Sequence, residues 1–156
     1  AYITPTMKEV DELVEAGADI VALDCTIRKR GDGTTINEFI AQIKEKYPDL
    51  MLMADVSNYE EGVNAWKCGV DIVGTTMSGY TPYTEAKDGP DYELMSHLAA
   101  DLDIPVIGEG KIHSPEEAVK ALSTGVWAIV VGGAITRPLE IAQRFMNAIA
   151  KAKGEA

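Results

Sequence analysis

Three carboxylates stand where apolar runs of this sequence end, and such acids can transfer protons. Glu109 closes the run in "IPVIGEG", and Asp24 and Asp55 close two earlier runs. A carboxyl group that is partly removed from water at the end of a buried strand has a raised pKa, which suits it to general acid or base catalysis near neutral pH. We therefore predict a catalytic or substrate-binding role for Glu109. The alternative is a structural salt bridge on a loop.

The other polar residues at the ends of apolar runs are candidates for substrate binding. Asp55 and Thr76 each follow such a run, and so does Asp24. Either aspartate could instead orient a neighbouring loop. For Asp24 an ion pair is an equal alternative, because the basic run "IRKR" follows it at residues 27–30.

Metal-assisted and covalent mechanisms have weaker support. Carboxylate oxygens suit Mg²⁺, but the spacing of Asp24, Asp55 and Glu109 along the chain gives little support for a metal site. His97 lies within a helical pattern and His113 just before one, so a zinc or iron site is not expected. There is no G-x-S-x-G nucleophile motif, and Cys25 and Cys68 lack metal or catalytic spacing. We predict no metal.

The segment "VVGGAITRP", residues 130–138, has the features of a phosphate site. Two glycines let backbone N–H groups approach an anion, a helix N-terminus adds its dipole, and an arginine can clamp the anion. A tight turn with a solvated arginine is the alternative. The recurrent phosphate site of barrel enzymes lies after the last strands, which favours the first interpretation. The predicted phosphate-binding residues are Gly110, Lys111, Gly132, Gly133 and Arg137.

These groups need strands to position them, and the sequence contains five. Gly17, Gly69 and Gly125 each stand between a helical pattern and an apolar run, where a left-handed residue ends a helix. Two more apolar runs are entered through proline. The five expected strands lie near residues 19–24, 50–56, 70–76, 104–108 and 127–132. They are apolar on both faces, as in a parallel sheet covered by helices.

Amphipathic patterns fill the gaps and predict six helices, so helices and strands alternate along the chain. This order predicts an α/β fold, either a (β/α)8 TIM barrel or a doubly wound sheet. Polar residues at every strand end, and the lack of G-x-G-x-x-G after any strand, favour the barrel. A closed barrel has eight strands in about 250 residues. We therefore expect residues 1–156 to be a single domain, the C-terminal two-thirds of such a barrel.

Composition excludes several classes of protein. The formal net charge of −11 repels nucleic acid and anionic lipid, and no apolar run is long enough to span a bilayer. We expect no nucleic-acid or membrane partner, and a cytoplasmic protein. The long connection at residues 75–95 carries three tyrosines. It could cover a substrate or contact another subunit, and the sequence does not separate these roles.

The segments "LMADVSNYEEG", "TTMSGYTPY", "PVIGEGKIHSPEEA" and "VVGGAITRP" resemble the bacterial N-acetylmannosamine-6-phosphate 2-epimerase family, over nearly all of the chain. The resemblance implies a (β/α)8 barrel isomerase without a redox cofactor. It would interconvert N-acetylmannosamine 6-phosphate and N-acetylglucosamine 6-phosphate in sialic acid catabolism. It also implies that Glu109 is a catalytic acid or base, or its close partner, and that Asp55 binds a substrate hydroxyl. The family commonly has arginine where Lys111 stands.

The resemblance further implies that a lysine upstream of Ala1 acts as the main base. Lys8 and Lys29 cannot take this role, because they lie on the wrong segments. We therefore expect an incomplete enzyme. The alternatives are another phosphate-binding barrel isomerase or lyase, and a non-catalytic half-barrel. A homo-oligomer, or a partner chain that supplies the missing strands, would cover the raw sheet edges.

Overall fold

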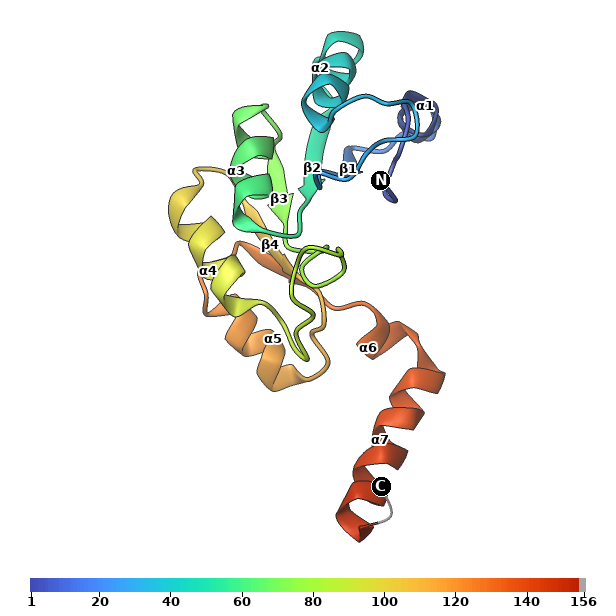
Figure 1. The fold of residues 1–156 in the computed structure, drawn as a ribbon, viewed down its shortest axis with the longest axis vertical. Coiled ribbons are helices and arrows are strands. Elements are labelled where there is room, and N and C mark those ends of the chain that lie inside the picture. The colour runs from blue at the N-terminus through green and yellow to red at the C-terminus, as the bar shows by residue number, and fades with distance from the viewer. Residues whose placement is uncertain (155–156) are drawn as a thin grey trace.

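The structure, a computed structural model, describes residues 1–154 and contains one sheet of five parallel strands (Figure 1). The strands are β1 (Ile20–Asp24), β2 (Met51–Asp55), β3 (Ile72–Gly74), β4 (Val106–Glu109) and β5 (Ala128–Val130). Each strand begins and ends within two residues of the position expected from the sequence. Gly17, Gly69 and Gly125 have φ values of 81°, 86° and 96°, which confirms the left-handed turns before β1, β3 and β5.

The order of the strands decides between the two α/β folds. The sheet order is β1-β2-β3-β4-β5, so every strand pairs with its neighbours in the chain. A doubly wound sheet reverses direction at a switch point, and this sheet does not. Sequential parallel strands are the arrangement of a (β/α)8 barrel, of which the described residues form five strands.

Side-chain caps fix where the main helices begin. Before each of the first five helices, the side chain of the preceding residue accepts a hydrogen bond from a backbone N–H of the first turn. Three of these helices also carry the reciprocal Glu of a capping box. The helices are α1 (Met7–Glu15), α2 (Ile36–Lys46), α3 (Tyr59–Lys67), α4 (Tyr92–Asp101), α5 (Pro115–Leu122), α6 (Gly133–Thr136) and α7 (Pro138–Lys153). None of these is long and apolar enough to cross a membrane.

The chain after β5 differs in detail from the single helix expected there. A short α6 comes first, and α7 starts at Pro138, which is suited to the first turn of a helix. The described residues therefore contain seven helices, where the sequence pattern predicted six. In Figure 1 the red α7 extends away from the sheet. Its side chains include the exposed Leu139, Phe145 and Met146.

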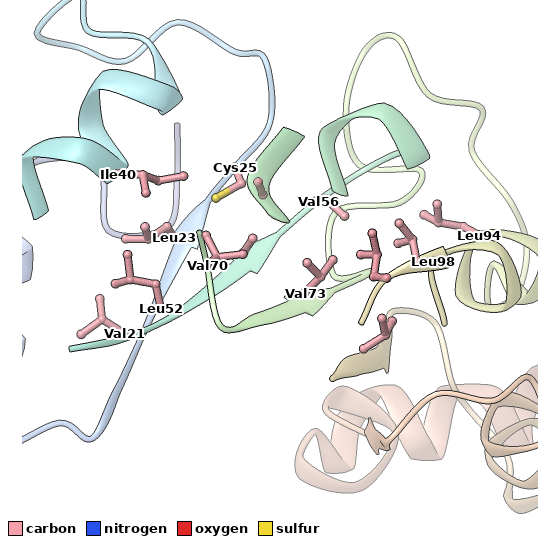
Figure 2. Close-up of a cluster of buried hydrophobic side chains, with 14 of the residues drawn as sticks. Val21, Leu23, Cys25, Ile40, Leu52, Val56, Val70, Val73, Leu94 and Leu98 are labelled. Atoms are coloured by element: carbon pink, nitrogen blue, oxygen red, sulfur yellow. The ribbon is translucent and has the colours of Figure 1, made fainter. Parts of the chain in front are cut away.

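The two faces of the sheet are covered very differently. Val21, Leu23, Leu52 and Val73 are fully buried in one cluster with side chains of the helices, among them Ile40, Leu94 and Leu98 (Figure 2). Alternate residues point to the opposite face. There Ile20, Met51 and Val130 remain 45%, 43% and 40% exposed. We call this second face the inner face, because it corresponds to the interior of a closed barrel.

Candidate active site

The strand register brings four of the predicted polar residues to one place. Asp24 pairs with Asp55, and Asp55 with Gly74, at the carboxyl ends of β1, β2 and β3. Two residues after Gly74 lies Thr76, and Glu109 ends β4. All four polar side chains share the parity of the inner face, because side chains alternate along a strand. Asp24, Asp55, Thr76 and Glu109 therefore gather where barrel enzymes keep their reactive groups.

Thr76 connects two of these acids directly. Its Oγ1 donates a hydrogen bond to Oδ1 of Asp55 and lies 3.3 Å from Oε2 of Glu109. The preceding residue, Thr75, makes its hydrogen bonds with the main chain instead. Its hydroxyl donates to the carbonyl oxygen of Glu109 at 2.8 Å and accepts from the Glu109 N–H at 3.0 Å. One threonine thus fixes the main chain of Glu109 and the other contacts its carboxyl group.

Burial changes the acidity of both carboxyl groups. Removal from water raises the pKa of Asp55 to about 7, and the charges of Glu109 and Asp24 act in the same direction, against the hydrogen bond from Thr76. Burial likewise raises the pKa of Glu109, again opposed by Thr76. Asp55 is therefore suited to gain and lose a proton near neutral pH, and the pKa of Glu109 is shifted in the same direction.

Asp24 has a different environment, although it lies next to Asp55 in register. Its carboxylate accepts bonds from the backbone of Tyr2 at 2.8 Å and from the hydroxyl of Thr26 at 2.6 Å, and pairs with Arg28 at 2.5 Å. Burial opposes ionisation, but these hydrogen bonds and the charge of Arg28 hold the pKa of Asp24 below its usual value. The geometry thus supports the ion-pair alternative for Asp24, whose pKa is lowered where those of Asp55 and Glu109 are raised.

The five predicted phosphate-binding residues line a single hollow beside Glu109. It has a volume of about 320 Å³, and Thr76 and Glu109 lie in its wall. Within residues 1–154, the N–H groups of residues 110–112 and 132–134 donate to no protein acceptor. Free N–H groups from two adjacent loops are suited to bind an anion. The lining includes Gly110, Lys111, Gly132, Gly133 and Arg137.

The two cations of this hollow have protein partners in the structure. Arg137 pairs with Glu140 at 2.9 Å, and both side chains are largely exposed. The ammonium of Lys111 donates to the carbonyl oxygen of Lys87 at 2.7 Å and lies over the ring of Tyr80. Lys111 also has a φ of 58°, a costly conformation for a residue with a side chain. An anion would have to draw Arg137 from Glu140.

Glu61 organises the loops above the site and was missed by the sequence analysis. It is 2% exposed, and its carboxylate accepts bonds from the N–H of Ile27 at 2.9 Å, from Ser57 and from the hydroxyl of Tyr83 at 2.7 Å. These donors belong to the loops after β1, β2 and β3. The spacing from Asn58 resembles a capping box, which predicts only a local contact.

We expect Glu61→Gln to destabilise the protein by about 2 kcal/mol or more. The side-chain amide replaces an acceptor oxygen with an N–H donor that faces other donors. Urea denaturation at neutral pH measures the loss. Glu60→Gln, one position earlier on the exposed side of α3, is the matched control. Equal stability of the two variants would contradict the role of Glu61.

Among residues 1–154, no three His, Cys, Asp or Glu side chains are placed to hold a metal ion. The sequential parallel strands place the chain in the class of (β/α)8-barrel proteins, a fold whose reactive groups generally lie at the carboxyl ends of the strands.

Comparison with known proteins identifies the particular barrel. Residues 1–151 match the model of the family NanE, described as "Putative N-acetylmannosamine-6-phosphate epimerase", and the chain belongs to this family. A relative from Caldanaerobacter subterraneus with the corresponding 2-epimerase description is 57% identical over 95% of this chain and 62% of its own length. One from Clostridioides difficile is 51% identical over 95% of this chain and 66% of its length. The chain therefore spans about two thirds of the length of these relatives.

Two solved structures resemble the fold. The N-acetylmannosamine-6-phosphate 2-epimerase of Clostridium perfringens has a TM-score of 0.87 and 49% identity, over 94% of this chain and 63% of that one. Thiamine phosphate pyrophosphorylase of Pyrococcus furiosus has a TM-score of 0.61 and 29% identity, over 81% of this chain and 55% of that one. In both comparisons the matched region makes up a larger share of this chain than of the solved structure.

Proposed function

We propose that this chain forms the C-terminal two-thirds of an isomerase that interconverts N-acetylmannosamine 6-phosphate and N-acetylglucosamine 6-phosphate. The observation that carries the proposal is the position of Glu109, which shares Thr76 with Asp55 and lines the hollow that contains Arg137. Membership of the family supports the choice of substrate.

The reaction inverts C2 of the sugar, next to the carbonyl carbon of the open chain. A base removes the C2 proton from one face, and a proton returns to the other face. Glu109 has the required location and a raised pKa, so we assign it to proton transfer or to stabilising the intermediate. Asp55 would bind a hydroxyl group of the substrate. Gly110, Lys111, Gly132, Gly133 and Arg137 would hold the phosphate.

The open inner face supports an assignment of this chain to part of a barrel. Ile20, Met51 and Val130 leave apolar surface exposed on that face, where a closed barrel is filled by side chains. Further strands would cover it, and in our proposal they carry the lysine base. These strands could be joined to this chain or supplied by a partner. The exposed apolar residues of α7 would also suit a homo-oligomer. We place the enzyme in the cytoplasm.

The proposal is tested by measuring epimerisation with and without the rest of the barrel. We define the completed barrel as this chain fused to the part of the Caldanaerobacter relative that it does not cover. Incubation with N-acetylmannosamine 6-phosphate in D₂O should yield N-acetylglucosamine 6-phosphate with deuterium at C2, detected by ¹H NMR. We expect turnover by the completed barrel and little by residues 1–156 alone. A folded completed barrel without turnover would refute the function, and full turnover by the chain alone would refute the missing base.

We expect Arg137→Ala in the completed barrel to raise KM for the phosphorylated sugar about tenfold or more, because a charged clamp on phosphate is lost. Removal of a surface cation elsewhere should not have this effect. Lys151→Ala, far along α7, is the matched control for net charge. Steady-state kinetics measures both variants. An unchanged KM for Arg137→Ala would remove this residue from the phosphate site.

A further inference from the structure

The hydroxyl of Thr76 lies between two carboxyl groups but has only one hydrogen to give. It donates to Oδ1 of Asp55, and its Oγ1 is 3.3 Å from Oε2 of Glu109. A hydroxyl can donate to one carboxylate while it accepts from a protonated carboxyl group. Both contacts are therefore hydrogen bonds only when one of the two acids carries a proton.

The charges around Asp55 favour that protonated state. Asp55 is 3% exposed, and Thr76 is the one hydrogen-bond partner of its carboxyl group among residues 1–154. The charged groups that face it are Glu109 from β4 and Asp24 from β1, both acidic. The neighbouring cation Arg28 is paired with Asp24. The buried Arg30 donates to backbone carbonyl oxygens, among them that of Asp24, so no cation within residues 1–154 pairs with Asp55 or Glu109. Two ionised groups on Thr76 would therefore repel each other.

Of the two adjacent threonines, only Thr76 bridges the carboxyl groups of Asp55 and Glu109. The hydroxyl of Thr75 makes both of its hydrogen bonds to the backbone of Glu109. Among residues 1–154 it thus makes no hydrogen bond to the carboxyl group of Asp55 or of Glu109. Thr76 lies on the inner face, between the ends of β2 and β4.

We propose that Thr76 is a positioning residue that joins Asp55 and Glu109 into one unit, which holds a single proton between the two carboxyl groups. When the shared proton is on Asp55 and Glu109 is ionised, the Asp55 O–H bond breaks as Thr76 Oγ1 accepts that proton. The Thr76 O–H bond breaks as Glu109 accepts the other. Asp55 ends as a carboxylate, Thr76 is unchanged and Glu109 is neutral again. Use of this transfer in turnover rests on the proposed function, whereas the sharing of the proton does not.

The test is a pH titration of the two carboxyl groups by ¹³C NMR on residues 1–156, without any sugar. Spectra of Asp55→Asn and Glu109→Gln assign the resonances. In the wild-type chain we expect both carboxyl resonances to respond at the same two midpoints, as coupled groups do. Thr76→Val, which keeps the shape but removes the hydroxyl, should separate the two titrations and move the upper midpoint by about one pH unit. Thr76→Ser should restore the wild-type curves.

The proposal would be overturned if Thr76→Val gave the same titration curves as the wild type. It would also be overturned if Thr76→Ser gave the same curves as Thr76→Val. Should Thr76→Val fail to fold, as judged by its amide spectrum, Asp55→Asn provides a second measurement. We expect it to leave Glu109 with a single midpoint, lower than the upper midpoint of the wild type, and an unaltered Glu109 curve would equally overturn the shared proton. The titrations do not depend on epimerisation. They therefore test the shared proton even if the protein proves to have no epimerase activity.

Discussion

Glu109→Gln in the completed barrel is expected to lower kcat about 10²- to 10⁴-fold, the usual contribution of a positioned acid or base. Glutamine preserves the size of the side chain and its contact with Thr76, but it cannot exchange a proton. Glu109 lines the hollow together with Arg137, so the phosphate contacts should survive. We therefore expect KM to change by less than about threefold, since binding is not what the substitution removes.

Two measurements separate this result from a loss of structure. Urea denaturation should show that Glu109→Gln is at least as stable as the wild type near neutral pH, because burial penalises the ionised carboxylate. Deuterium uptake at C2 should fall together with kcat. Wild-type turnover of a folded Glu109→Gln protein would return Glu109 to a structural role.

Local patterns were sufficient to predict the framework of this fold. Gly125, for example, ends one element through a conformation that suits glycine, and an apolar run follows it. Such signals depend only on neighbours in the chain. The same holds for the cap Ser114 and its reciprocal partner Glu117, three residues later. The division of the last helical segment was not predicted, because "GGAITRP" satisfies the pattern of either a turn or a helix.

The carboxyl ends of parallel strands meet at one edge, so the gathering of Asp55 and Glu109 could be predicted from the strand pattern. Their partners could not. Glu61 binds donors from three loops, and Tyr83 reaches it from 22 residues away. Sequence spacing gives no measure of such tertiary contacts. The ion pair of Asp24 with Arg28 was anticipated as one of two equal alternatives, and only the folded geometry favours it.

We expect Asp55→Asn to stabilise the protein above neutral pH. The pKa of Asp55 is 3.8 in a model peptide and about 7 in the fold. Below pH 3.8 both folded and unfolded chains hold the proton. Between these values only the folded chain holds it, so the stability contributed by this group falls as pH rises, and it is constant above the folded pKa. A gap of about three units corresponds to about 4 kcal/mol, at about 1.4 kcal/mol per unit.

The comparison of variant with wild type isolates this group from the other acids of the chain. The free energy of unfolding of Asp55→Asn, from urea denaturation, should exceed that of the wild type by several kcal/mol at about pH 8, and the excess should shrink toward about pH 4. Asp24→Asn is the matched control, because Asp24 pairs with Asp55 in register but its pKa is lowered. It should lose stability at about pH 8, since Arg28 would lose its partner. Loss of stability in both variants would show that the fold stabilises the ionised form of Asp55. The proposal that this site holds a proton near neutral pH would then fail.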